Sequence, residues 1–209
     1  MAMESSSQLA WLGTSEGPIT IARLSPAGVA IECELRGHTA SVRAIVDVSG
    51  PLLSFDAEGV VYSWNGTSRR ASDRARLPAP DCATDAVATL PGVAAVAYSS
   101  GLVRLWSAEG FNTPRLLAQL AAHTRIVTGL SWHAGTQRLA SVSEDAQLTV
   151  WSLKANSDDA ATPVKADLSS RVDVTDHMLQ GVALYSQDGA GCIAAVVAYD
   201  VLAARLIHV

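Results

Sequence analysis

The sequence predicts an all-β fold of the propeller class, and the regular spacing of its tryptophans is the first observation behind this prediction. Trp64, Trp106 and Trp151 each close a short β-like run, and they lie 42 and 45 residues apart. A repeat of about 40–45 residues is typical of chains that copy one supersecondary unit, and in propellers this unit is a blade of four antiparallel strands. The chain therefore has room for about four to five blades.

Alternation of apolar and polar residues within each unit is the second observation. The clearest unit begins at Ala122 and His123, continues with IVTGLSW and RLASVS, and turns at Asp145 into QLTVW. Such alternation is typical of a β-strand with one buried face. The unit that begins at Gly37 repeats the order with SVRAIVDV, PLLSF and VVYSW. Between the two lies a degraded copy that has no histidine at its start.

The whole chain, residues 1–209, is expected to form a single propeller domain, complete or incomplete. Its repeats are expected at residues 9–36 (partial), 37–78, 79–118, 119–168 and 172–209, the last being the closing blade. Two polar, turn-rich stretches, Asn65–Pro78 and Lys154–Ser170, are predicted to be long connections. The second of them is expected to carry one weak outer strand around Val164–Leu168.

Composition and charge argue against several classes of protein. Apolar residues make up 49% of the chain and the net charge is −5, so a core can form but a basic face for nucleic acid is not expected. The nearest basic cluster is Arg69, Arg70, Arg74 and Arg76, which falls in a predicted solvated connection. No apolar run reaches the roughly 18–20 residues of a membrane span, and the N-terminus lacks a signal-peptide pattern. We therefore expect a soluble cytoplasmic protein with no nucleic-acid partner and no membrane insertion.

Metal, cofactor and catalytic motifs are not found in the sequence. Cys33, Cys82 and Cys192 are odd in number and far apart, without the spacing of a zinc site. The acidic residues between 173 and 188 lack the spacing of a calcium loop, and no phosphate-binding or nucleophile motif occurs. His133 and His177 lie in predicted turns and are expected to be exposed. The sequence thus predicts no metal, no cofactor and no catalytic residue.

The units resemble those of the WD40-repeat propellers. The resemblance is carried by Gly-His near the start of a unit, Ser in the second strand, an acid in the next turn and Trp closing the third strand. In that family these side chains form a buried hydrogen-bond relay that satisfies each polar group. The resemblance implies the following structural relay residues: His38, Ser54, Glu58 and Trp64 in one unit, and His123, Ser141 or Ser143, Asp145 and Trp151 in the other.

Four departures from the family pattern bear on this interpretation. A second acid, Asp56, lies two residues before Glu58. The middle unit has Ser100 where an acid belongs, so the relay of the middle unit is expected to be lost. Trp11 and Trp132 fall outside the third-strand position. For these two side chains we favour packing in the core over a role as exposed interface anchors. The familiar Trp-Asp dipeptide is absent, because the residues after the three repeat tryptophans are Asn65, Ser107 and Ser152.

A closer resemblance is to the C-terminal portion of the family of WD repeat-containing protein 54, and it covers most of the chain. It is carried by LRGHTASV, by RLASVSEDAQLTVWSL and above all by the ending from Val174 to Val209, with an Ala-Tyr-Asp turn at Ala198–Asp200. Members of that family are larger, with further blades ahead of the matching segment. The resemblance favours a chain that is part of a larger propeller, whose ring needs the missing blades or a partner chain to close. The alternative is a shorter relative whose five blades close a small ring by themselves.

These observations favour a non-enzymatic scaffold that binds other proteins, with the two predicted connections as the expected contact elements. One alternative is a structural subunit of a large assembly, for example a ciliary or cytoskeletal one. A less favoured alternative is an enzyme with a site in the central channel. For such a site the predicted inner strands offer only Arg43, Asp47 and Asp85.

Overall fold

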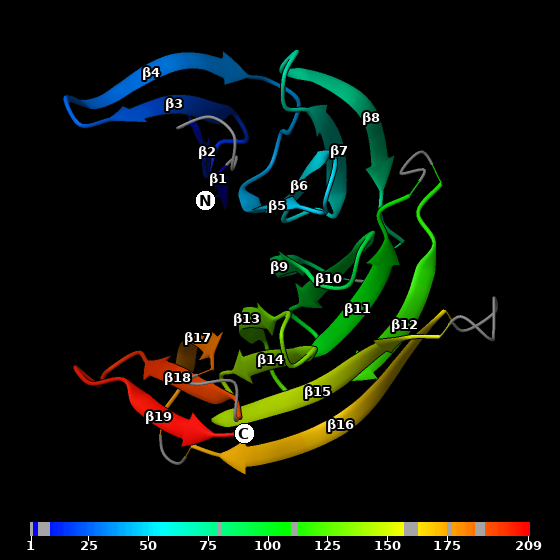
Figure 1. Cartoon of the computed structure of the whole chain (residues 1–209), viewed down its shortest axis with the longest axis vertical. Helices are drawn as coiled ribbons and strands as arrows, with labels where there is room; N and C mark the ends of the chain where they lie inside the picture. Colours follow the sequence, from blue (N-terminus) through cyan, green and yellow to red (C-terminus); the bar gives the residue numbers. More distant parts are fainter. Residues whose placement is uncertain are drawn as a thin grey trace.

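The structure is a computed structural model that describes residues 2–3, 9–78, 81–109, 113–156, 163–174, 177–186 and 191–209, with backbone alone for residues 2–3. All regular elements in these ranges are β-strands (Figure 1). None of the described segments is a helix long and apolar enough to cross a membrane. The prediction of an all-β fold is therefore confirmed.

The described strands form five antiparallel sheets, which we call blades 1 to 5 in chain order. Blade 1 consists of β1 (Ala2–Met3), β2 (Leu9–Gly13), β3 (Ile19–Ser25) and β4 (Gly28–Leu35). Blade 2 consists of β5 (Val42–Asp47), β6 (Leu52–Asp56), β7 (Val60–Asn65) and β8 (Arg70–Arg76). Blade 3 consists of β9 (Ala83–Ala88), β10 (Val93–Tyr98), β11 (Leu102–Ser107) and β12 (Leu116–Ala121).

The last two blades differ in their number of strands. Blade 4 consists of β13 (Val127–His133), β14 (Arg138–Ser143), β15 (Gln147–Ala155) and β16 (Val164–Asp173). Blade 5 consists of β17 (Leu179–Tyr185), β18 (Ile193–Ala198) and β19 (Arg205–His208). Blade 5 is thus the one sheet of three strands among the described residues, and β19 is its outer edge.

The blades are arranged around a common centre as a five-bladed β-propeller (Figure 1). The inner strands β5, β9, β13 and β17 contact one another in succession, while β4, β8, β12 and β16 lie at the periphery. Blades 1 and 5 stand apart in Figure 1, at the two ends of the series of sheets. This arrangement confirms the predicted propeller with four to five blades.

The apolar core lies between neighbouring blades, in four clusters of described residues. One cluster joins each of the pairs 1–2, 2–3, 3–4 and 4–5. Between blades 3 and 4, for example, Leu105 packs with Leu139 and Leu153, all fully buried. Each such side chain contributes about 1.5–3 kcal/mol relative to an exposed one. Trp11 is also fully buried, between blades 1 and 2, and Trp132 is half-buried in the cluster between blades 3 and 4.

Outer strands occupy much of the two stretches predicted to be connections, which corrects that prediction. The arginine cluster lies on and just before β8, the outermost strand of blade 2, rather than in a loop. β16 continues to Asp173, past the weak strand expected around Val164–Leu168, while residues 157–162 lie outside the described residues. An outer strand pairs on one side only and is largely exposed, so it tolerates polar residues and loses the apolar alternation that marks a strand.

In each of blades 1 to 4, the turn between the second and third strands contains a residue with positive φ. These residues are Gly17 (φ 102°), Gly59 (78°), Gly101 (85°) and Ala146 (62°). A Cβ on Gly101 would lie 2.2 Å from the carbonyl oxygen of His123, and one on Gly17 would lie 2.4 Å from that of His38. The turn of one blade thus fits closely against the histidine that begins the next.

Candidate functional site: buried relays and an exposed sheet face

A buried relay of hydrogen bonds joins the start of blade 2 to its second and third strands. His38 places Nδ1 2.8 Å from Oδ2 of Asp56 and Nε2 2.6 Å from Oγ of Ser54. The indole N–H of Trp64 donates to the same hydroxyl at 2.8 Å. A neutral imidazole protonated on Nδ1 satisfies the whole set, because it donates to the carboxylate and accepts from the hydroxyl.

The acid of this relay is Asp56, which corrects the prediction of Glu58. Asp56 ends β6 and is buried, whereas Glu58 is exposed in the turn. The backbone N–H groups of Glu58 and Val60 donate to Oδ1 of Asp56, at 3.0 and 2.9 Å, so this carboxylate also holds the turn. Spacing alone favours the wrong acid, because Glu58 stands six residues before Trp64, as Asp145 stands six residues before Trp151.

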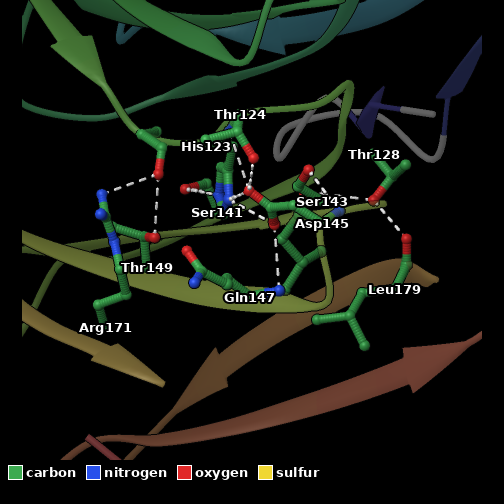
Figure 2. Close-up of polar contacts among 12 residues, drawn as sticks. His123, Thr124, Thr128, Ser141, Ser143, Asp145, Gln147, Thr149, Arg171 and Leu179 are labelled. Carbon is green, nitrogen blue, oxygen red and sulfur yellow. Dashed lines mark hydrogen bonds and ion pairs between the residues drawn. The ribbon is translucent and has the colours of Figure 1, made fainter. Parts of the chain in front are cut away.

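The second relay lies at the start of blade 4 (Figure 2). His123 places Nδ1 3.1 Å from Oδ1 of Asp145 and Nε2 2.9 Å from Oγ of Ser141. Asp145 also accepts the backbone N–H groups of Thr124, at 3.0 Å, and Gln147, at 3.1 Å. This carboxylate therefore ties the turn between β14 and β15 to the segment that begins the blade.

Ser143 and Trp151 do not take part in the second relay. Of the two serines that the sequence left open, Ser141 contacts the ring, while Ser143 accepts the backbone N–H of Asp145 at 3.1 Å. The indole N–H of Trp151 is buried without an acceptor among the described residues, although Trp151 follows Ser141 by as many residues as Trp64 follows Ser54. The relay of blade 4 thus ends at the hydroxyl.

Blade 3 has a tyrosine in place of the relay. The indole N–H of Trp106 donates to Oη of Tyr98 at 3.2 Å, and both side chains are buried. Burial raises the pKa of Tyr98 to about 12, although the hydrogen bond from Trp106 opposes this shift. Sequence reasoning missed Tyr98 because tyrosine does not belong to the family pattern. A signal was present: Tyr98 precedes its tryptophan by eight residues, as Asp56 precedes Trp64.

Blade 5 retains part of a relay. Nδ1 of His177 lies 3.0 Å from Oδ1 of Asp200. The Asp200 side chain is exposed, whereas His177, which was expected to be exposed, is half-buried. Val196 stands four residues before Asp200, where blade 4 has Ser141 before Asp145. The pair therefore has no hydroxyl to extend it into the sheet.

The two relay histidines are neutral rather than cationic at neutral pH. Burial lowers the pKa of His38 and of His123, and the neighbouring carboxylates oppose that shift without cancelling it. Burial also acts to raise the pKa of Asp145. The hydrogen bonds that Asp145 accepts from the backbone of Thr124 and Gln147 and from the His123 ring outweigh burial, so the pKa of Asp145 is lowered. In each relay a neutral imidazole therefore donates a hydrogen bond to a carboxylate and accepts one from a serine hydroxyl.

The aspartates predicted for the central channel accept hydrogen bonds from backbone N–H groups. Arg43, Asp47 and Asp85 line a pocket of about 360 Å³ between β5 and β9. Oδ1 of Asp47 accepts the N–H of Ser49 at 2.9 Å, and Oδ2 of Asp85 accepts the N–H of Leu130 at 2.8 Å. Burial raises the pKa of Asp85 despite this bond. Each carboxylate has a structural partner, and no hydrogen bond joins the two among the described residues.

The described ranges hold no group of three or more His, Cys, Asp or Glu side chains that could bind a metal ion. All three cysteines are free: Cys192 is buried, Cys33 is half-buried and Cys82 is exposed. The residues that the sequence singled out therefore serve the interior of the blades, and a binding surface has to be sought elsewhere.

An exposed apolar face of blade 5 is the clearest candidate for a binding surface. The pairing of β17, β18 and β19 places Tyr185, Ile193, Val197 and Leu206 on one face, opposite the face that packs on blade 4. Tyr185 is 37% exposed, Val197 44% and Leu206 62%. The same pairing places Gly181, Ala183, Ala195 and His208 on this face, and we call the whole set the open face.

The apolar exposure of the molecule is concentrated in this blade. Six of the ten large apolar side chains that are exposed among the described residues lie between 178 and 206. Concentrated exposure of this kind marks binding surfaces on soluble proteins. Sequence reasoning placed contacts in the connections instead, because the open face reads in the sequence like any other buried strand face.

Comparison with known proteins agrees with the architecture. The family model WDR54 matches residues 6–208. The chain is 24% identical over 163 residues to mouse WD repeat-containing protein 54, which covers 74% of this chain and 48% of the mouse protein. It is 34% identical over 82 residues to the chicken Denticleless protein homolog, which covers 38% of this chain and 11% of that protein. The chain thus spans about half the length of the mouse protein and about a tenth of the chicken protein. With a family model matched along nearly its whole length and a propeller of WD40 type, the chain belongs to the WDR54 family of WD-repeat proteins.

Proposed function

We propose that this chain is a non-enzymatic scaffold for protein interactions, and that its open face binds an apolar β-sheet of another polypeptide. The observation that carries the proposal is the set of exposed apolar side chains on blade 5, among them Val197 and Leu206. A WD-repeat propeller supports protein binding in general, and the partner's chemistry is our inference from the face itself.

The chemistry of the covered faces in the same molecule supports this choice of partner. Each of the four interblade clusters is an antiparallel sheet packed on the next sheet through apolar side chains. The open face carries no Lys, Arg, Asp or Glu, so it does not select a charged partner. Since the curated relatives of the same family are about twice as long, the occupant we propose is a sheet of propeller-blade type.

The proposal can be tested by light scattering on the purified chain over a range of concentrations. Without a partner, open faces should pair with one another, and the average mass should rise above 21.8 kDa. The double variant Val197→Thr/Leu206→Thr places β-branched residues, which strands favour, at both positions but makes the face polar. This variant should remain monomeric at concentrations where the natural chain associates.

The control is Ile31→Thr on β4, because Ile31 is 73% exposed but lies outside the open face. It should associate like the natural chain, with circular dichroism showing that all variants keep their β-structure. A natural chain that stays monomeric at every concentration would contradict the proposal. So would an Ile31→Thr variant that is as monomeric as the double variant.

We also propose a cytoplasmic location, supported by three cysteines that remain free in the structure, one of them exposed. Fractionation of cells that carry a tagged chain would test this, and recovery in a secreted fraction would contradict it. A ciliary or cytoskeletal assembly is one setting in which such a scaffold could serve, and the same fractionation would reveal it.

A further inference from the structure

The segment around Ser72 combines a basic sequence with an accessible hydroxyl. Ser72 is the one serine in the chain that follows two adjacent arginines, Arg69 and Arg70, at three and two residues before it. Guanidinium groups form their strongest contacts with carboxylates. This spacing therefore suits an enzyme that reads two arginines with acidic side chains and acts on the hydroxyl that follows.

The backbone at Ser72 is exposed and incompletely paired. β8 is the outermost strand of blade 2 and pairs only with β7. Trp64 pairs with Ala71 and Ser63 pairs with Asp73, so Ser72 is the extra residue of a β-bulge. A bulged residue is left out of the ladder, and bulges on outer strands present side chains in new directions. The segment is thus already extended, as a peptide in a kinase groove must be.

The hydroxyl itself is held by weak contacts. Oγ of Ser72 donates to the carbonyl oxygen of Ser63 at 3.1 Å and lies 3.0 Å from the Ser63 hydroxyl. Ser72 is exposed and lines a pocket of about 530 Å³ together with Asn65 and Thr67. Rotation about one side-chain bond frees the hydroxyl, and the pocket leaves space beside it.

The two arginines differ in accessibility. Arg70 is exposed, whereas Arg69 is half-buried and forms an ion pair with Glu32 of blade 1. Glu32 also pairs with Arg23. An acidic side chain of an enzyme can therefore contact Arg70 directly and has to replace Glu32 to contact Arg69.

We propose that Ser72 is a phosphorylation site for a protein serine kinase with an acidic substrate groove. The γ-phosphoryl group of ATP passes to Oγ of Ser72. The new O–P bond forms as the bond from the γ-phosphorus to the β,γ-bridging oxygen breaks, the hydroxyl proton goes to the kinase's catalytic aspartate, and ADP leaves. The product carries a charge of about −2 beside the arginine cluster, which turns a basic edge of blade 2 into a nearly neutral one.

Blade 4 provides an internal control for this proposal. Trp151 pairs with Leu168 and Val150 pairs with Ser170, so Ser169 is the bulged residue of β16 in the equivalent position. Ser169 is exposed, like Ser72, but the residues three and two before it are Ala166 and Asp167. The same backbone geometry without the arginines should therefore not be phosphorylated.

The test is to treat the folded chain with ATP and the catalytic subunit of cAMP-dependent protein kinase, which serves as an arginine-directed probe. Intact mass should show one phosphate per chain, and peptide mapping should place it on Ser72. Ser72→Ala should abolish incorporation, whereas Ser169→Ala should leave it unchanged. Arg69→Gln/Arg70→Gln should lower the initial rate by about tenfold or more.

Circular dichroism on each variant shows whether the β-fold is kept, so that a change in rate is not the result of unfolding. The proposal is overturned if the folded natural chain takes up no phosphate, or takes it up only at another residue. It is equally overturned if phosphorylation of Ser72 proceeds at the same rate without the two arginines. None of these outcomes bears on the open face of blade 5, because β8 lies in a different blade.

Discussion

The carboxylate of Asp56 lies 2.8 Å from Nδ1 of His38, at the end of the strand that also supplies Ser54. His38 and Asp56 are 6% and 1% exposed, so water cannot replace either partner. Because Asp56 also accepts two backbone N–H groups of the following turn, one side chain fixes the start of the blade, its second strand and its turn together. A residue outside the family pattern thus holds blade 2 in place.

Substitution of this acid should separate the two candidates for the relay. Asp56→Ala leaves the His38 N–H and two backbone N–H groups without an acceptor, so we expect it to lower the free energy of unfolding by roughly 2–3 kcal/mol. Glu58→Ala, at an exposed position, should change it by less than about 0.5 kcal/mol. Urea denaturation followed by tryptophan fluorescence measures both. Equal losses, or a larger loss for Glu58→Ala, would show that the relay is assigned to the wrong acid.

The phenol of Tyr98 should ionise above the ordinary range of a tyrosine. Its pKa is raised to about 12 by burial, so the alkaline absorbance titration should show one late-ionising tyrosine that is absent in Tyr98→Phe. The same substitution leaves the indole N–H of Trp106 without its acceptor, which should cost about 1–2 kcal/mol of stability. Tyr199→Phe is the control, because Tyr199 is 75% exposed. Loss of the late step in the control instead would refute the assignment.

Substitution of the turn residue with positive φ should stabilise the protein in blade 4 and destabilise it in blade 3. Ala146→Gly removes a Cβ from the left-handed region, so we expect it to raise the free energy of unfolding by about 0.5–1 kcal/mol. Gly101→Ala introduces both an unfavourable φ and a contact 2.2 Å from the His123 carbonyl oxygen, so it should be destabilising. Thermal unfolding of both variants gives the sign. Two changes of the same sign would contradict the argument.

Stability should fall as the solution becomes mildly acidic. The pKa values of His38 and His123 are lowered in the folded chain, so the unfolded chain binds more protons below the ordinary histidine value of 6.5. The stability that neutral histidines confer is therefore fully present above pH 6.5 and is lost as the pH falls from there toward the folded pKa values. Melting temperatures measured between about pH 8 and pH 5 should show this decline.

The control for the pH dependence is a pair of histidine variants. His38→Gln should give a flatter curve of melting temperature against pH, since one of the two titrating groups is gone. His208→Gln, at an exposed position next to the C-terminus, should leave the shape of the curve unchanged. If the His38 variant kept the full decline, the protonation of this ring would not be its cause.

Much of the fold could be predicted from the sequence, while the site could be predicted only in part. The spacing of Trp64, Trp106 and Trp151 and the alternation around them led to the propeller and its blades. The relay histidines were found because Gly-His and Ala-His stand at similar distances before a tryptophan, 26 residues for His38 and 28 for His123. The acid of blade 2 was misassigned because two acids lie two residues apart, and the sequence does not show which one points inward.

Other features could not be found in this way. The outer strand β8 was predicted to be a connection, because polar side chains on both of its faces hide the strand pattern. Tyr98 was missed because its role depends on reaching the indole of Trp106 across the sheet. The open face was missed because apolar alternation predicts a buried face whether or not a second sheet covers it.

The sequence by itself determined the fold class, the number of blades and the residues that begin and close them. These features depend on local chain geometry: a strand alternates every two residues, and a blade repeats at a nearly constant length. Only the tertiary structure decided that Asp56 rather than Glu58 meets His38, that the indole of Trp151 has no partner, and that Val197 and Leu206 face outward. Those outcomes depend on which side chains neighbouring sheets bring within hydrogen-bonding or packing distance, and a one-dimensional pattern does not contain that distance.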